Sequence, residues 1–166
     1  MTRLNSMVFL ERRIPPPIVF LISAAFIYFT AREAGFVLLP ELLRDFFGTA
    51  FFLLGAVLIM RAFLLFRKKG TTLSPNRRAI ETSLITEGVF SYSRNPIYLG
   101  MFIMLMSFSL FTGSLNTLLG PGFFLFFIDR FQIGAEEAAL EERFGESFLR
   151  YKSRTRRWFG RTSKAL

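Results

Sequence analysis

The chain has 166 residues, of which 52% are hydrophobic, and it carries a formal net charge of +9. It is too apolar for an ordinary soluble domain of this length, and its apolar residues fall in blocks, so it indicates a small polytopic membrane protein with one domain over residues 1–166. The absence of cysteine and histidine excludes disulfides, thiolate nucleophiles, histidine triads and metal sites built from either residue. The positive charge gathers at the ends of apolar segments, which suits anionic lipid headgroups better than nucleic acid.

The first two apolar segments predict membrane-spanning helices over about residues 17–31 and 46–66. The first follows a run of three prolines, which cannot lie inside a helix. The second contains Gly48 and Gly55, which are seven residues apart and therefore share a helical face. Small residues on such a face allow a neighbouring helix to approach closely.

Two further spans are predicted over about residues 96–111 and 115–133, joined by a short uncharged turn, so they form a helical hairpin. Gly120-Pro121-Gly122 is expected to kink the last span, because proline removes a helical hydrogen bond. Arg61 and Asp129 lie within the second and fourth spans. They are expected either to pair across helices or, for Arg61, to extend toward the headgroups.

The segment of about residues 135–158 predicts an amphipathic helix on the membrane surface. Its acidic residues come first and its basic residues last, which complements the helix dipole, and Trp158 is an expected interfacial anchor. The N-terminal lead, the long loop before Arg94 and this segment are all basic. The positive-inside rule therefore places them, and both termini, in the cytosol.

The stretch Glu87–Gly100, with the sequence EGVFSYSRNPIYLG, lies where a basic loop turns into the third span. Pro96 predicts the first residue of a helix, with Asn95 as its N-cap. Read alone, the stretch is typical of a loop-to-helix junction with anchoring tyrosines. The predicted hairpin, however, brings Arg94 near Glu136, and a helix start favours anions.

The same stretch resembles the G-x-[FY]-x-[YF]-x-R-[HN]-P-x-Y-x-G signature of the isoprenylcysteine carboxyl methyltransferase and phospholipid methyltransferase superfamily. Glu136-Glu137 and the residues up to the Arg154–Trp158 close resemble the family's second motif, E-E-x-x-L-x-x-x-[FY]-G-x-x-[YF]-x-x-Y-x-x-x-x-x-R-[WF]. The two motifs occur in the family's order and cover roughly residues 70–158. The resemblance implies an all-α integral membrane protein, a short bacterial-type member of the bacterial cytoplasmic membrane, with about four spans and a C-terminal amphipathic cytosolic helix.

The resemblance also implies S-adenosylmethionine as the methyl donor and no metal. Arg94, Asn95 and Glu137 are the expected catalytic residues. The expected cofactor-binding residues come from both motifs and are Arg94, Asn95, Tyr98, Leu99, Gly100, Glu136, Glu137, Tyr151 and Arg154.

The expected partners are a lipophilic small-molecule or lipid acceptor and membrane lipids, without nucleic acid. A carboxylate or thiolate acceptor needs no strong general base, so the reaction does not require histidine. Asn95 stands where many relatives, including the eukaryotic prenylcysteine enzymes, have histidine. The alternatives are a phospholipid N-methyltransferase and a non-catalytic membrane subunit that keeps the fold.

Overall fold

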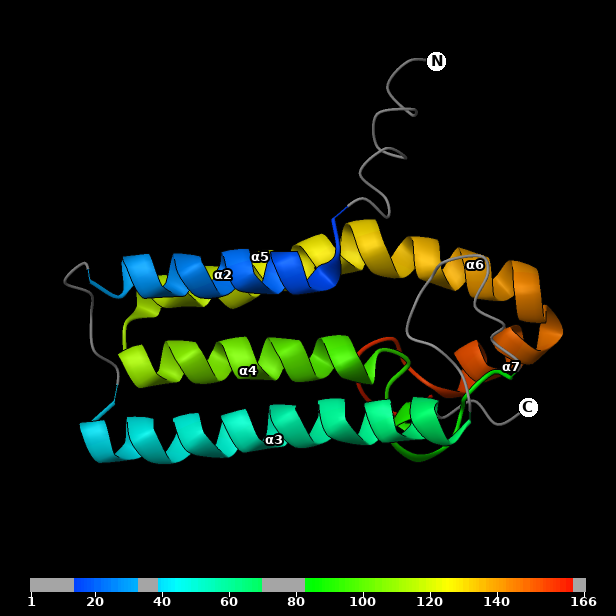
Figure 1. Ribbon diagram of the computed structural model, residues 1–166, viewed down its shortest axis with the longest axis horizontal. Coiled ribbons are helices and arrows are strands. Elements are labelled where there is room, and N and C mark those ends of the chain that lie inside the picture. The colour runs from blue at the N-terminus through cyan, green and yellow to red at the C-terminus, as the bar shows by residue number, and fades with distance from the viewer. Residues whose placement is uncertain (1–13, 33–38, 70–82, 163–166) are drawn as a thin grey trace, which may run out of the picture. The chain divides into compact units, whose positions relative to one another are not determined.

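The computed structural model describes residues 14–32, 39–69 and 83–162, so the N-terminal lead and most of the long basic loop lie outside the described residues. Every regular element in the described ranges is a helix (Figure 1), which confirms the predicted all-helical fold class for this part of the chain. The elements are α2 (Pro16–Thr30), α3 (Glu41–Lys68), η1 (Gly88–Ser91), α4 (Pro96–Thr112), η2 (Leu115–Leu118), α5 (Leu119–Phe127), the π-helical η3 (Ile128–Ile133), α6 (Gly134–Phe144) and α7 (Glu146–Arg154).

The chain divides into two compact units. Unit 1 comprises Met1–Ala56 and Met101–Ala135, and unit 2 comprises Val57–Gly100 and Glu136–Leu166. Helices α3 and α4 each contribute one end to each unit. Arg61 belongs to unit 2 and Asp129 to unit 1, so their predicted pairing stays a prediction.

In unit 1, α2 runs beside α5 (Figure 1). Gly120 makes the close approach possible, because a Cβ atom there would lie 2.6 Å from Ile27 Cγ1 and 3.0 Å from the backbone oxygen of Ser23. Beside this contact, the rings of Phe20 and Phe124 meet edge to face with their centroids 6.3 Å apart. Aromatic pairs in this geometry add to the free energy of apolar burial.

A second close helix contact in unit 1 joins α3 to α4. A Cβ atom on Gly48 would lie 2.6 Å from Phe111 Cε1, so the predicted close helix approach is confirmed at this glycine. The buried hydroxyl of Ser107 donates a 2.7 Å hydrogen bond to the carbonyl oxygen of Gly48. Small side chains and interhelical hydrogen bonds are the usual means by which apolar helices associate in lipid.

The predicted fourth span continues beyond its expected end, and the kink expected at its proline stays a prediction. Pro121 is the third residue of α5, in the first helical turn, where proline is tolerated. The carbonyl oxygen of Thr117, four residues earlier, accepts a 3.1 Å hydrogen bond from the Ser109 hydroxyl in place of the amide that proline lacks. Beyond α5 the helix continues through η3 into α6, so that residues 115–144 form one helical run.

Two helical runs, Glu41–Lys68 and Leu115–Phe144, are long and apolar enough to cross a membrane, whereas the apolar helices α2 and α4 are shorter. Only 11% of the most apolar window of α3 is buried, and large side chains such as Leu53 and Met60 are exposed. A core helix of a soluble protein would bury this face, so the exposed apolar surface fits contact with lipid. The count of four spans stays a prediction.

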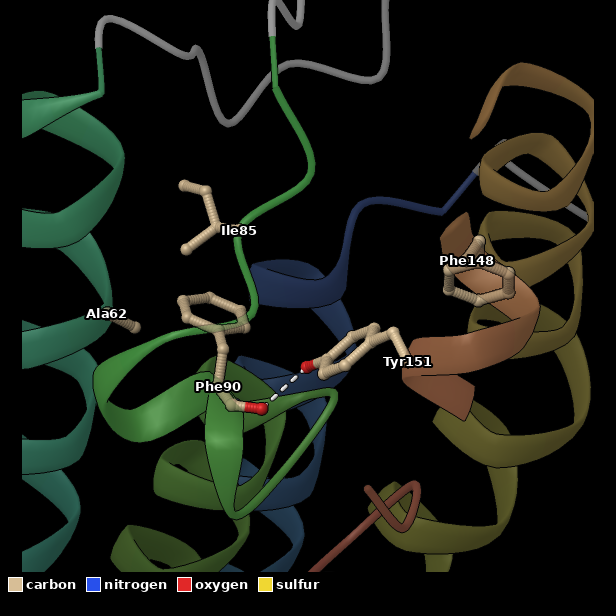
Figure 2. Close-up of a cluster of buried hydrophobic side chains, with 5 residues drawn as sticks. All are labelled: Ala62, Ile85, Phe90, Phe148 and Tyr151. Carbon is tan, nitrogen blue, oxygen red and sulfur yellow. Dashed lines mark hydrogen bonds between the residues drawn. The ribbon is translucent and has the colours of Figure 1, made fainter. Parts of the chain in front are cut away.

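Unit 2 has its own buried apolar cluster, formed by Ala62, Ile85, Phe90, Phe148 and Tyr151 (Figure 2). These residues come from α3, the loop before η1, η1 itself and α7. The Tyr151 hydroxyl donates a 2.7 Å hydrogen bond to the carbonyl oxygen of Phe90. The cluster and this bond hold α7 against η1, which immediately precedes the signature arginine.

The predicted single amphipathic helix over about residues 135–158 is wrong. Helix α6 ends at Phe144 and α7 begins at Glu146, because Gly145 adopts a φ of +49° in the left-handed region. The Gly145 amide closes α6 with a 2.9 Å bond to the carbonyl oxygen of Glu141. Glycine at this position ends helices because it has no Cβ to clash in the left-handed conformation.

Candidate functional site

The signature stretch forms a short 3-10 helix, a turn and the start of α4. Gly88 has a φ of +60°, and a Cβ atom on it would lie 2.8 Å from Leu65 Cδ1, so glycine lets η1 pack against α3. Pro96 is the first residue of α4, as predicted. The Leu99 amide donates a 2.9 Å bond to the carbonyl oxygen of Asn95, which is the first helical bond and places Asn95 at the N-cap.

The centre of the site is a buried carboxylate held between two guanidinium groups. Arg94 Nη2 lies 2.9 Å from Glu137 Oε1. Arg157 contacts the same carboxylate, with Nη2 2.8 Å from Oε2 and Nε 3.2 Å from Oε1. The side chains of Arg94 and Glu137 are each 9% exposed and that of Arg157 is 33% exposed. A carboxylate this far from water needs such partners, because its desolvation is otherwise uncompensated.

Two nitrogens of the Arg94 guanidinium are not used in the contact with Glu137. Its Nε and Nη1 atoms are buried and have no hydrogen-bond partner among the described residues. Burial lowers the pKa of Arg94, and the charge of Glu137 opposes that effect, but a guanidinium stays protonated in proteins. Unsatisfied buried donors cost roughly 1–3 kcal/mol, and more when charged. Two unpaired nitrogens, with three N–H groups between them, on a buried cation form a site suited to an anion such as a carboxylate.

The segment after α7 crosses the start of α4 and is tied to it. The Arg94 amide donates to the carbonyl oxygen of Arg156 at 3.1 Å. The Asn95 side-chain amide and the Ser93 hydroxyl both donate to the carbonyl oxygen of Arg157, at 3.1 Å and 3.4 Å. Asn95, predicted to be catalytic, therefore uses its amide to hold the backbone that carries Arg157.

A second polar pair joins the two predicted motifs. The Tyr98 hydroxyl in the first turn of α4 donates a 2.7 Å hydrogen bond to Glu136 Oε1 in the first turn of α6. Leu99 is half-buried and Gly100 is buried, and both follow in α4. The structure thus brings the arginine–proline stretch and the glutamate pair together, as the predicted hairpin requires.

The C-terminal residues differ from expectation in which arginine reaches the site. Tyr151 is buried and bonded to Phe90, and burial raises its pKa above the ordinary value, so it stays a neutral donor. Arg154 is exposed at the end of α7. Arg157, which the sequence reasoning did not select, contacts Glu137 instead. A signal for it existed, since the arginine–aromatic pair that closes the second motif coincides with Arg157-Trp158.

These features define a class of protein: a helical protein with exposed apolar helices and a buried arginine–glutamate site at the start of one of them. A profile of the phospholipid methyltransferase family matches residues 43–147, which is more than half of the chain. The chain belongs to this family, which indicates a membrane methyltransferase. The matched range includes Arg94, Glu136 and Glu137 and ends before Tyr151 and Arg157.

Among curated proteins, the chain is similar to an uncharacterized protein of Haemophilus influenzae. The two are 39% identical over 62 residues, which is 37% of this chain and 98% of that protein. No solved structure matches the chain.

Proposed function

We propose that this protein is an integral-membrane methyltransferase that transfers a methyl group from S-adenosylmethionine to a lipophilic acceptor. The observation that carries the proposal is Arg94, a buried cation with two unpaired nitrogens beside Glu137, in a chain that belongs to a methyltransferase family. The donor has a carboxylate, an ammonium group, ribose hydroxyls and a sulfonium, and the site offers a counterpart for each.

Different residues of the site bind different polar groups of the donor. Arg94 holds the carboxylate through a charge-assisted hydrogen bond from one of its unpaired nitrogens, Nε or Nη1, while its Nη2 stays on Glu137. Glu136, oriented by the Tyr98 hydroxyl, accepts hydrogen bonds from ribose hydroxyls or from the ammonium group. Glu137 keeps Arg94 in position rather than binding the donor directly, since both of its oxygens already accept bonds from arginines.

Methyl transfer requires the protein mainly to align the donor with the acceptor. The bound donor supplies a methyl group on a positively charged sulfur, and an in-line displacement forms the acceptor–methyl bond as the carbon–sulfur bond breaks. The chain's contribution is to orient both partners and to exclude water. Tyr98, whose ring is fixed by its bond to Glu136, presents an aromatic face of the kind that attracts cations. Leu99 and Gly100 provide apolar lining and room next to the backbone.

The family description favours one alternative, a phospholipid amine as the acceptor. A protonated amine must first lose a proton, and Glu137 is poorly placed to take it because of its two arginine partners. Glu136 is then the remaining carboxylate in the motif pair that can act as the base. A carboxylate or thiolate acceptor avoids this requirement, so the leading proposal remains an acceptor of the isoprenylcysteine carboxyl methyltransferase type.

Calorimetry of S-adenosylhomocysteine binding to the detergent-solubilised full chain tests the donor site. We expect saturable one-to-one binding that weakens by about 10- to 100-fold in Arg94→Ala, since hydrogen bonds to charged groups contribute about 1.5–3 kcal/mol. Glu137→Ala should also weaken binding, because Arg94 loses the carboxylate that positions it. Circular dichroism checks that each variant keeps its helical content.

Arg150→Ala is the matched control, because Arg150 is exposed on α7 and its contacts among the described residues are with Glu146 and Ser147 of that helix. It removes the same charge and should leave the affinity unchanged. Normal affinity in both site variants would refute the assignment of the donor site. No binding by the folded protein, with and without added lipid, would instead favour the non-catalytic membrane subunit.

A further inference from the structure

After α7 the chain forms a compact reversal, Thr155–Arg161, called here the C-terminal hairpin. Thr155 and Arg161 form an antiparallel bridge, and the Arg156 amide donates a 2.9 Å bond to the carbonyl oxygen of Gly160. Gly160 has a φ of +106°, a conformation that glycine adopts without strain. The hairpin is therefore a defined element and not a loose tail.

The hairpin presents aromatic and basic side chains together. Phe159 is 69% exposed. Tyr92, whose carbonyl oxygen accepts a hydrogen bond from the Gly160 amide, is 52% exposed. Arg161 lies over the Tyr92 ring, 4.8 Å from its centroid, and Arg156, near the start of the hairpin, is exposed. Large exposed aromatics rimmed by charge are typical of an interaction surface rather than of a surface facing bulk water.

The charged residues of the hairpin itself, Thr155–Arg161, are all arginines. From Ser147 to Leu166 the sequence contains seven lysines and arginines and no acidic residue. Arginine side chains near a bilayer are attracted to anionic headgroups, by about fivefold in binding equilibrium for each charge. The surface is thus complementary to a negatively charged partner.

The position of the hairpin identifies that partner. The Gly160 amide donates a 2.7 Å bond to the carbonyl oxygen of Tyr92, and the Arg94 amide donates to Arg156. Both contacts lie within four residues of Pro96, where the apolar helix α4 begins. An element fixed at the start of an apolar helix lies at the level where that helix enters a membrane, which is also the depth that aromatic side chains prefer.

We propose that the C-terminal hairpin docks on the anionic lipid surface of the bilayer, with Phe159 in the interfacial region and Arg156 and Arg161 on lipid phosphates. The hairpin also carries the backbone that places Arg157 on Glu137. Docking therefore fixes the polar site at the headgroup level, where a lipophilic acceptor arrives. The proposal stands on the exposure, charge and attachment of the hairpin and does not require methyltransferase activity.

The chain provides its own reporter, because Trp158 in the hairpin is its only tryptophan. The full chain is reconstituted into phosphatidylcholine vesicles with and without phosphatidylglycerol, using acyl chains brominated at different depths. We expect stronger quenching of Trp158 fluorescence by bromines near the headgroup than by bromines near the chain end. Phosphatidylglycerol should increase the quenching and high salt should reduce it.

Two variants separate the apolar and the ionic contributions. Phe159→Ser removes the exposed aromatic and should lower the quenching in both lipids. Arg156→Gln should reduce only the increase caused by phosphatidylglycerol, corresponding to about fivefold weaker docking for one charge. Arg150→Gln removes one charge from α7 outside the hairpin and should behave like the parent protein.

Free quenching of Trp158 by aqueous iodide in both lipids, without quenching by bromolipids, would overturn the proposal. Equal bromolipid quenching in the parent, Phe159→Ser and Arg156→Gln proteins would also overturn it. Protection from iodide that depends on the protein-to-lipid ratio and not on lipid charge would assign the surface to a second copy of the chain, against the proposal.

Discussion

At the scale of single residues, the site depends on which arginine contacts Glu137. Arg157 makes two bonds to this carboxylate, whereas Arg154 is exposed at the end of α7. Without Arg157, Arg94 is the arginine left on the buried carboxylate within the described residues, and Arg94 must then serve both Glu137 and the donor. Arg157 is thus a positioning residue in the proposed reaction, and Arg154 is not.

We therefore expect Arg157→Ala to weaken S-adenosylhomocysteine binding by about tenfold, the value of one charge-assisted hydrogen bond. Arg154→Ala should leave the affinity unchanged, although both variants remove one arginine from the same segment. Arg157→Lys keeps the charge without the paired donors and should bind with intermediate affinity. Calorimetry gives the affinities, and circular dichroism the helical content. A larger loss of affinity in Arg154→Ala than in Arg157→Ala would contradict this prediction and would favour Arg154, the residue expected from the sequence, as the arginine of the site.

The sequence predicts those parts of the site that depend on local constraints. The start of α4 follows from the fixed φ of Pro96, and the meeting of the two motifs follows from the helical hairpin between them. The choice between Arg154 and Arg157 does not follow from helical spacing, because it depends on where the chain leaves α7. Thr155 is extended, with φ −124° and ψ 130°, and only the tertiary contacts of the hairpin carry Arg157 to Glu137.

At the scale of elements, glycines decide where helices meet and where they end. Phe144, Phe148 and Tyr151 fall at the spacing of one helix, and the order of acidic and basic residues over about residues 135–158 also predicted one continuous amphipathic helix. The helix breaks at Gly145, yet Phe144 before the break packs against the same cluster that contains Phe148 and Tyr151 after it. Sequence periodicity predicts which residues share a buried face, but it does not show that the helix breaks between them, as it does at Gly145.

Gly120 and Gly122 make a matched test of helix packing in unit 1. Gly120 faces Ile27 and the backbone of Ser23 on α2, whereas a Cβ atom on Gly122 would meet nothing within 4 Å. Gly120→Ala should force α2 away from α5 and destabilise the protein by about 1–3 kcal/mol, as overpacking does. Gly122→Ala should be neutral or stabilising by up to about 1 kcal/mol, because alanine is the better helix former.

Thermal unfolding in detergent, followed by circular dichroism at 222 nm, measures the difference between these two alanine variants. Equal midpoints for the two variants would show that α2 does not pack on Gly120 in solution. A lower midpoint for Gly122→Ala than for Gly120→Ala would contradict the packing outright.

At the scale of the whole molecule, the number of membrane crossings decides where the proposed site faces. Helices α2 and α4 have 15 and 17 residues and are about 22 Å and 26 Å long, against a hydrocarbon core of about 30 Å. A mismatch of this size costs only fractions of a kcal/mol per ångström, since the bilayer can thin around a short helix. Length alone therefore does not exclude four crossings.

The charges favour four crossings. The connector of residues 32–45 holds two arginines and three acidic residues, and the turn of residues 112–116 holds no charge, whereas the long loop and the C-terminal segment are basic. Under the positive-inside rule, four crossings place every basic segment in the cytosol. Two crossings, by the longer runs alone, would put the long loop and the C-terminal segment on opposite sides of the membrane.

Single-cysteine labelling separates these arrangements without background, because the chain has no cysteine of its own. With Arg32→Cys, Asn116→Cys and Ser153→Cys variants in the cytoplasmic membrane of intact bacteria, four crossings predict that an impermeant maleimide labels the first two from outside. Ser153→Cys should react only after permeabilisation, since it lies on the cytosolic side with the proposed site. If only the longer runs cross, Arg32→Cys and Ser153→Cys will behave alike and Asn116→Cys will differ from both. That pattern would move the turn of residues 112–116 to the same side as the basic loop and would refute the four-span topology.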